Sequence, residues 1–135
     1  MVLSGHEFHD AVRRWFLDQR LDGTLLFCRS TQQSFLRLLT TPAVLGRFGN
    51  PPLTNAEAWQ VYRGLLGDRR VAYAAEPQDL ERHWQRLAAR DIAAPKIWMD
   101  GYLAAFAMTS GSQLVTIDAA FRHYEGLDLA LLSRP

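Results

Sequence analysis

The chain has 135 residues, which is enough to bury a hydrophobic core, and we expect residues 1–135 to form a single domain. Its formal charge of +1 excludes a bulk attraction to nucleic acid or membrane, so any binding of a polyanion needs a local patch. Residues 1–3 are far too short for a signal-peptide core, and no apolar run approaches membrane-spanning length, so we expect a soluble, cytoplasmic protein without membrane contact.

Helical and strand patterns alternate along the chain. Helices are predicted where apolar residues recur every three or four positions, and strands where short apolar runs lie between turn residues. In chain order, the predicted elements are a helix over 6–21, a strand over 24–28, a helix over 30–40, an irregular loop over 42–53, a helix over 54–66 and a strand over 71–74. They continue with a helix over 76–90, a loop over 91–97, a helix over 98–109, a strand over 114–117, a helical turn over 119–124 and a final strand over 127–132.

Several residues indicate where these elements begin and what they bury. Ser30 or Thr31 can cap the second helix, and Thr54 with Glu57 has the spacing of a capping box. The single cysteine, Cys28, excludes an intramolecular disulfide and a cysteine-based zinc site, and we expect it to pack as a small hydrophobe. Helices that alternate with short apolar strands are typical of an α/β domain whose mostly parallel sheet is covered on both faces.

Two carboxylates, Asp100 and Asp118, carry the clearest signal for chemistry. Asp118 follows the strand of 114–117, and ligands bind beyond the carboxyl ends of parallel strands. Asp100 is predicted in the first turn of its helix, where the dipole stabilises an ionised carboxylate. Such carboxylates bind Mg²⁺ or Mn²⁺, and the metal then activates water and neutralises phosphate charge. Aspartate is also common as a helix cap and after strands, so structural roles stay open for both residues.

Gln32 and Arg37 are polar residues in an otherwise apolar predicted helix. Either they face the same strand-end cleft as Asp118, or they are a first-turn residue and a solvated or ion-paired side chain. The four histidines form no metal-ligand set, and no glycine-rich phosphate loop, nucleophile elbow or zinc-peptidase motif is present. The positive charge is almost all arginine, with Lys96 as the only lysine.

Three stretches agree in order and spacing with one known family. They are residues 31–44, the stretch Ile97-Trp-Met-Asp-Gly-Tyr-Leu-Ala-Ala-Phe-Ala107, and the stretch Leu114-Val-Thr-Ile-Asp-Ala-Ala-Phe121. Together with the entry to the first helix at residues 6–9, they resemble the PIN-domain ribonucleases, specifically the VapC-type toxins of toxin–antitoxin systems. The resemblance extends along nearly the whole chain. It implies a PIN-like, Rossmann-like fold with three α/β/α layers and a mostly parallel sheet.

The resemblance also implies a function and a site. It indicates a Mg²⁺- or Mn²⁺-dependent endoribonuclease, with RNA as substrate, a cognate antitoxin as partner and a homodimer as assembly. Asp100 and Asp118 match the family's two later acidic positions, which are catalytic and bind the metal, and Thr116 matches a threonine two residues before the last acid. Gln32 stands where many members carry glutamate and would ligate through its amide oxygen or through a water, and Arg37 would contact phosphate.

The amino terminus departs from the family's pattern. The family opens with a strand ending in an Asp-x-Asn motif, which supplies the first metal-binding aspartate, whereas residues 1–5 lead directly into the first predicted helix. We therefore expect a chain that is truncated relative to the family, either through a misassigned start codon or through a shortened gene.

This truncation has expected consequences for the metal, the sheet and the activity. Two carboxylates should bind metal weakly, because affinity for hard cations depends on the number of charged ligands. About four strands should close up or be completed by dimerisation, with Met1–Ser4 not paired in mid-sheet. The alternative function is a catalytically silent PIN-like domain that acts through protein contacts, by forming dimers or by binding an antitoxin.

Overall fold

The structure is a computed structural model that describes residues 9–133, with side chains from Asp10 onward. These residues form two compact units, an amino-terminal unit up to Ala75 and a carboxyl-terminal unit spanning Glu76–Ser133. Each unit contains one pair of parallel strands. Within residues 9–133, no helix combines the length and the apolar character that crossing a membrane requires.

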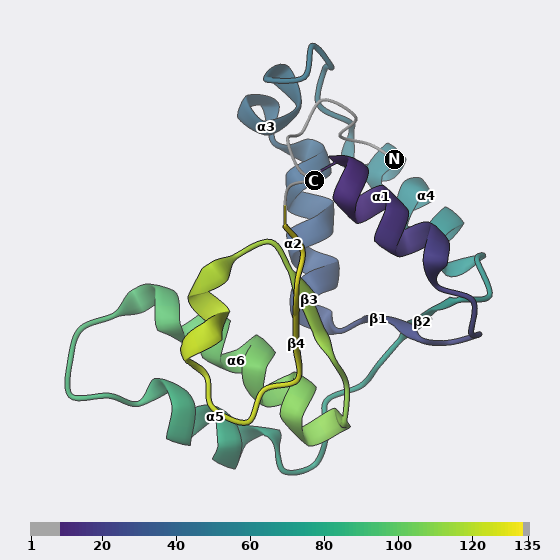
Figure 1. Cartoon of the computed structure of the whole chain (residues 1–135). Helices are drawn as coiled ribbons and strands as arrows, with labels where there is room; N and C mark the ends of the chain where they lie inside the picture. The colour runs from purple at the N-terminus through teal and green to yellow at the C-terminus, as the bar shows by residue number, and fades with distance from the viewer. Residues whose placement is uncertain (1–8, 134–135) are drawn as a thin grey trace. The chain divides into compact units, whose positions relative to one another are not determined.

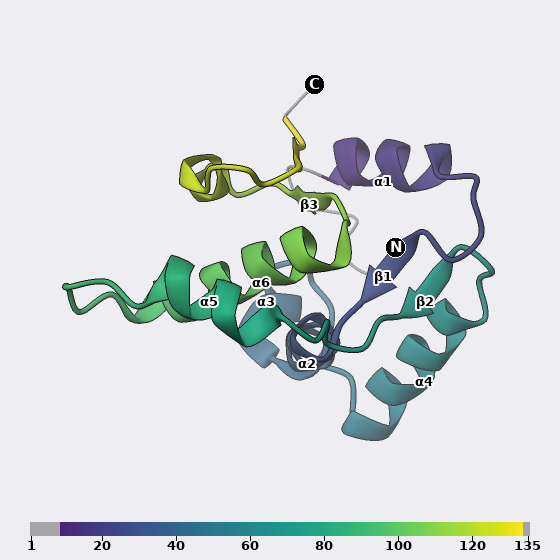
Figure 2. The ribbon, with the colours of Figure 1, turned by 90° about the horizontal axis from the view of Figure 1, so that it is seen from below.

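The amino-terminal unit is built around two parallel strands. Its elements are α1 (His9–Asp18), β1 (Leu25–Phe27), α2 (Arg29–Thr40), α3 (Pro42–Gly46), α4 (Asn55–Leu66) and β2 (Val71–Tyr73). Leu25 lies opposite Val71 and Phe27 opposite Tyr73, and the helices between the strands form the crossover that a parallel pair requires (Figure 1). Figure 2 shows α2 and α4 on one side of this pair and α1 on the other.

The starts of α2 and α4 test the predicted helix caps. α4 begins as predicted, because the Glu57 N–H donates to Thr54 Oγ1 at 3.1 Å and the Thr54 N–H donates to Glu57 Oε2 at 2.8 Å. The prediction that Ser30 or Thr31 caps α2 is wrong, since Cys28 is the cap residue and the helix starts directly after it. Thr31 lies within the first turn, where its hydroxyl accepts a hydrogen bond from the Cys28 N–H at 2.9 Å.

The irregular loop predicted over residues 42–53 contains a short helix, α3. Pro42 opens this helix, because the fixed φ of proline suits the first helical position, where an N–H would have no partner within the helix. Leu45 is buried, so the turn contributes an apolar side chain to the core of the unit. The loop is therefore shorter than predicted by these five residues.

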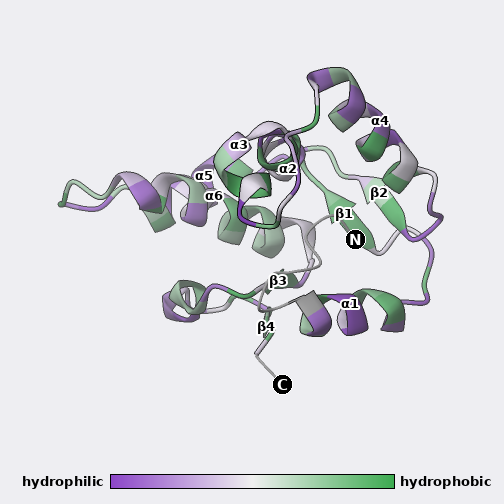
Figure 3. Cartoon of the chain, turned by 90° about the horizontal axis from the view of Figure 1, so that it is seen from above, coloured by the Kyte–Doolittle hydropathy of each residue, from purple (hydrophilic) through white to green (hydrophobic). Residues whose placement is uncertain are grey.

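Aromatic side chains fill the space between β1, α2 and α4. The ring of Phe27 meets that of Tyr62 edge-on at 5.3 Å between centroids, and its centroid lies 5.6 Å from that of Phe35. Cys28 is buried beside this cluster, which confirms that it packs as a small hydrophobe. In Figure 3, β1 and β2 are coloured as mainly hydrophobic. This core fixes α2 at the carboxyl end of β1.

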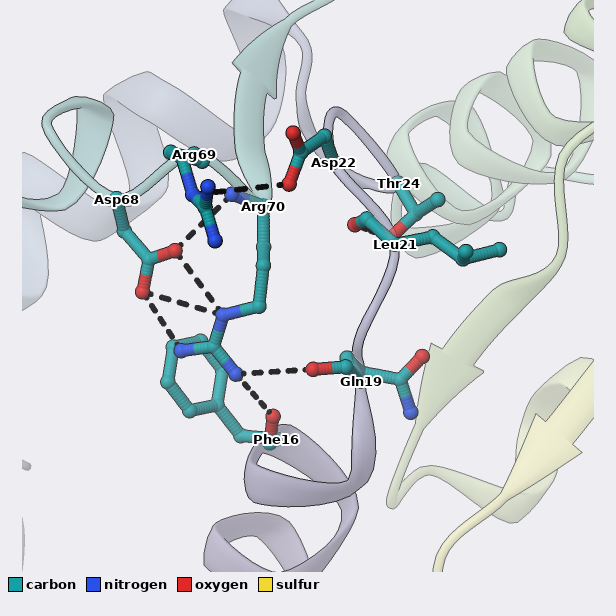
Figure 4. Close-up of polar contacts among 8 residues, drawn as sticks. All are labelled: Phe16, Gln19, Leu21, Asp22, Thr24, Asp68, Arg69 and Arg70. Atoms are coloured by element: carbon teal, nitrogen blue, oxygen red, sulfur yellow. Dashed lines mark hydrogen bonds and ion pairs between the residues drawn. The ribbon is translucent and has the colours of Figure 1, made fainter.

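Arg70, directly before β2, ties the end of α1 to the rest of the unit (Figure 4). Its Nη1 donates to the carbonyl oxygens of Phe16 and Gln19 at 2.8 and 3.2 Å, which satisfies acceptors at the carboxyl end of the helix. The guanidinium also lies over the Phe16 ring and pairs with Asp68, with 2.6 Å between Nη2 and Oδ2. The hydrogen bonds from Arg70 lower the pKa of Asp68 from 3.8 to about 2.

The carboxyl-terminal unit packs two helices against a second pair of parallel strands. Its elements are α5 (Leu80–Ala88), α6 (Pro95–Ser110), β3 (Leu114–Thr116), the 3-10 helix η1 (Ala119–His123) and β4 (Leu129–Leu131). Leu114 lies opposite Leu129 in the strand pair. The helices α5 and α6 lie side by side, and they are close at Gly101, where an added Cβ would lie 3.2 Å from Ala88 Cβ. Ala104 of α6 packs against Phe121 in the core of this unit.

α6 begins three residues earlier than predicted, at Pro95 rather than Trp98. Proline again suits the first helical position, and Gly111 ends the helix in the left-handed conformation, with φ of 64°. The earlier start makes Asp100 the sixth residue of the helix, so its predicted place in the first turn is wrong. The helix dipole therefore gives the Asp100 carboxylate little support, because the effect falls off within the first turn.

The predicted α/β class is confirmed by the helices and parallel strands of both units. Among residues 9–133 the strands form two pairs, β1 with β2 and β3 with β4, and the predicted single sheet of about four strands is not seen in this part of the chain. Apolar runs predict strands but not their partners, because a run of three residues carries almost no information on pairing. The predicted behaviour of Met1–Ser4 falls outside the described residues, and the single domain and the homodimer stay predictions.

Candidate metal centre

Asp118 lies two residues beyond the carboxyl end of β3, where it caps η1. Its Oδ1 accepts a hydrogen bond from the Ala120 N–H at 2.9 Å, and its Oδ2 accepts one from Lys96 Nζ at 3.2 Å. Its own N–H donates to Thr116 Oγ1 at 3.1 Å. Thr116 therefore holds the turn that presents the Asp118 carboxylate, as a positioning residue at the strand end.

Asp100 approaches the same place from α6. Lys96 precedes it by one helical turn, and Lys96 Nζ lies 3.7 Å from Asp100 Oδ2. The Asp100 side chain is only 16% exposed, compared with 42% for Asp118 and 70% for Lys96. The ammonium of Lys96 thus stands between two carboxylates, one half-open to solvent and the other largely withdrawn from it.

The charges in this cluster shift the pKa values of its members in a consistent direction. The hydrogen bond from the Ala120 N–H, followed by that from Lys96, lowers the pKa of the Asp118 carboxyl group below its ordinary value. The hydrogen bond to Asp118, followed by the charge of Asp100, raises the pKa of the Lys96 ammonium. Both shifts favour the charged forms, so Asp118 and Lys96 are an ion pair at neutral pH.

Tyr124 adds a buried polar atom near these charges. Its hydroxyl is buried and has no hydrogen-bond partner among the described residues. Burial raises the pKa of the Tyr124 phenol, and the negative charge of Asp100 raises it further. An unsatisfied buried hydroxyl costs about 1–3 kcal/mol.

The donor set fits a hard divalent cation. Asp100 and Asp118 each direct a carboxylate oxygen at one positive group, which is the arrangement that such a cation requires. Across residues 9–133, no group of three or more histidine, cysteine, aspartate or glutamate side chains is arranged to hold a metal. Mg²⁺ commonly binds through only one or two carboxylates and keeps several waters. The two carboxylates therefore suit Mg²⁺ or Mn²⁺ in a largely hydrated form.

Gln32 and Arg37, the other predicted site residues, lie on α2 in the amino-terminal unit and do not share a face. Gln32 is buried, and its Oε1 accepts a hydrogen bond from Arg29 Nη1 at 2.5 Å. The Arg29 guanidinium also lies over the Tyr73 ring, 4.9 Å from its centroid. Arg37 is exposed in the last turn of the helix. The structure thus brings Asp100, Thr116 and Asp118 together within one unit and gives Gln32 and Arg37 two different environments.

Two features of this region were not predicted: the contact of Lys96 with Asp100 and Asp118, and the buried hydroxyl of Tyr124 without a partner. Lys96 carried one signal, which is that it is the only lysine in an arginine-rich chain. Its four-residue spacing from Asp100 becomes informative only once the helix is known to begin at Pro95. Tyr124 carried none, because a tyrosine after a helical turn is most often a core residue. Only the three-dimensional structure shows that its hydroxyl is unsatisfied.

Comparison with known proteins gives a family match that begins in the amino-terminal unit and covers most of the carboxyl-terminal unit. The family model of the PIN domain matches residues 1–127. Ribonuclease VapC41 of Mycobacterium tuberculosis (strain CDC 1551 / Oshkosh) is 53% identical over 135 residues, which is 99% of this chain and 92% of that relative. Ribonuclease VapC41 of Mycobacterium tuberculosis (strain ATCC 25618 / H37Rv) matches with the same identity and coverage.

Proposed function

The chain belongs to the PIN-domain family, in its branch of VapC-type ribonucleases. From this premise we propose that it cleaves RNA with a Mg²⁺ or Mn²⁺ ion that Asp100 and Asp118 hold. One observation carries the proposal: the two carboxylates converge on a single positive group, with 3.7 and 3.2 Å between their oxygens and Lys96 Nζ. Endoribonuclease ancestry and a two-carboxylate cation site support the same chemistry.

Each residue of the site has a distinct task in this proposal. Asp100 and Asp118 would hold the ion through their carboxylate oxygens. A divalent cation held there supplies an activated water and neutralises negative charge on the phosphate that is attacked. The lowered pKa of Asp118 keeps its carboxylate ionised at neutral pH, and Thr116 keeps it at the strand end through the hydrogen bond from the Asp118 N–H.

Residues of α2 would act on the substrate side. Arg37 is exposed, and arginine suits contact with the phosphates of an RNA strand. Gln32 would assist through its amide oxygen, which accepts a hydrogen bond from Arg29 in the described structure. A cognate antitoxin is the protein partner that VapC-type ancestry suggests, and assembly as a homodimer and a cytoplasmic location belong to the same proposal.

Cleavage of single-stranded RNA by the full chain tests this function. We expect cleavage that requires added Mg²⁺ or Mn²⁺, that stops with EDTA, and that is lost in Asp118→Asn. The matched control is Asp91→Asn, which removes an exposed carboxylate of the same unit and should leave the rate unchanged. Metal-independent cleavage, or equal rates for the two variants, would contradict the proposal.

A catalytically silent domain is the second candidate. It is favoured by the Lys96 ammonium, which already neutralises part of the charge that would hold a metal. A silent domain would bind a partner chain but would not cleave RNA at any metal concentration. The same cleavage assay therefore separates the two candidates.

A further inference from the structure

We infer that Lys96 is a built-in cation at the metal position of Asp100 and Asp118, and that a divalent metal binds in competition with it. This inference rests on the proposed function, because it takes these two carboxylates as the metal ligands. It goes beyond that function by assigning to Lys96 the control of metal affinity.

The contacts of Lys96 support this assignment. Its Nζ lies 3.2 Å from Asp118 Oδ2 and 3.7 Å from Asp100 Oδ2, so one ammonium serves both carboxylates. The Asp100 carboxylate is only 16% exposed, and a carboxylate withdrawn from water needs a nearby positive charge. Lys96 supplies that charge in the absence of metal and keeps the two carboxylates facing one point.

The side chain of Lys96 is also able to leave. It is 70% exposed and ends in a compact ammonium on a flexible four-carbon stem, which water solvates strongly. A divalent cation and the ammonium cannot both contact the same two oxygens, because their positive charges repel at such short range. Metal binding therefore includes the displacement of Lys96. The measured free energy of metal binding is the free energy of the metal contacts minus that of the Lys96 ion pairs that are lost.

The competition predicts that removal of the ammonium strengthens metal binding. We expect Kd to fall about tenfold, because both ion pairs share the exposed Lys96 ammonium and pairs with an exposed partner are individually weak. Lys96→Met removes the charge and keeps most of the stem, and Lys96→Gln is a second neutral variant. Lys96→Arg retains a positive charge and should retain the competition.

Binding of Mn²⁺, followed by the electron paramagnetic resonance signal of the free ion, measures this effect without reference to activity. We expect Kd for Mn²⁺ to fall about tenfold in Lys96→Met and in Lys96→Gln, and to stay near the wild-type value in Lys96→Arg. Arg82→Met is the matched control, because it removes an exposed positive charge from α5 in the same unit, and it should leave Kd unchanged. Circular dichroism of each variant shows whether it is folded.

The outcomes separate this inference from the proposed function. If wild type and both neutral variants bind Mn²⁺ with equal Kd, or if the neutral variants bind more weakly, the competition is refuted and the metal site stands. If Arg82→Met tightens binding as much as Lys96→Met, the effect is one of overall charge and the inference is also refuted. If no variant binds Mn²⁺ at millimolar concentration, the proposed metal site itself fails.

Discussion

The two strand pairs show how similar local frameworks present different chemistry at their carboxyl ends. In the amino-terminal unit, the positive charge beyond β1 and β2 is Arg29, which lies over the Tyr73 ring and donates to Gln32. In the carboxyl-terminal unit, Asp118 follows β3, and α6 contributes both Lys96 and Asp100. Both pairs are parallel, and in both the first strand leads within two residues into a helix.

The difference lies in the charge and not in the backbone. A parallel pair with a crossover brings side chains to one edge whatever their type. Carboxylates at that edge can hold a hard cation, whereas an arginine engaged by an aromatic ring and an amide cannot. The proposed metal chemistry therefore belongs to the carboxyl-terminal unit.

The largest expected effect follows from removing a carboxylate. Asp100→Asn should lower kcat/KM for RNA cleavage by at least about a hundredfold, because even outer partners of metal ligands contribute 10- to 100-fold. Gln32→Leu, at the edge of the other strand pair, should lower it by less than about tenfold, since it removes at most an assisting group. Cleavage kinetics of the two variants measure both effects. If Gln32→Leu lowered kcat/KM as much as Asp100→Asn does, the two strand pairs would not differ in their importance for cleavage.

Two glycines sharpen the comparison of the helices. Gly101→Leu should destabilise the protein by about 2 kcal/mol or more, because even a Cβ at this site would lie 3.2 Å from Ala88 Cβ. Gly64→Ala on α4 meets nothing within 4 Å and should stabilise by about 0.5–1 kcal/mol. Urea denaturation of both variants provides the free energies of unfolding. If both substitutions changed the free energy of unfolding in the same direction, the close approach of α5 and α6 would not explain the effect at Gly101.

The positioning role of Thr116 predicts a smaller effect. Thr116→Val removes the acceptor of the hydrogen bond from the Asp118 N–H and should lower kcat/KM about fivefold, since a neutral hydrogen bond contributes about 1 kcal/mol. Thr116→Ser keeps the hydroxyl and should retain activity near the wild-type value. Steady-state cleavage assays compare the two. If serine loses as much activity as valine, the methyl group and not the hydrogen bond is responsible.

The smallest expected effect concerns the ion pair of Asp68 and Arg70 in the amino-terminal unit. The pKa of Asp68 is lowered from 3.8 to about 2, so the pair contributes stability above pH 4 that is lost as pH falls toward 2. Asp68→Asn should therefore unfold at a lower temperature than wild type at pH 5, and the difference should narrow between pH 4 and pH 2. Thermal unfolding over this range measures it. A difference that is constant with pH would mean that the carboxylate charge is not involved.

The sequence predicts most of the elements, for reasons that are local. It also singles out Asp100 and Asp118, whose carboxylates the structure brings to one ammonium. The capping box of Thr54 and Glu57, the apolar strand runs and the stop at Gly111 are all encoded within a few residues. The resemblance to the family identifies the class and the fold, and the PIN-domain match confirms both.

The features that the sequence does not predict depend on contacts between distant residues. The pairing of β1 with β2 joins residues more than forty positions apart, and apolar runs do not specify such partners. The place of Lys96 between Asp100 and Asp118 depends on where β3 ends relative to the first turns of α6. The start of α6 at Pro95 was missed because the apolar pattern is clear only from Trp98 onward, and that error moved Asp100 by three positions.

Addition of Mn²⁺ to the ¹⁵N-labelled full chain, followed by amide NMR, tests the central claim most directly. Paramagnetic Mn²⁺ broadens the signals of nearby residues, so the site is located without an activity assay. We expect the amide signals of Asp100 and Asp118 to broaden at the lowest metal concentrations and to be unaffected in Asp118→Asn. Signals of these two residues that stay sharp at millimolar Mn²⁺ in the wild-type chain would contradict the assignment of a metal site to Asp100 and Asp118.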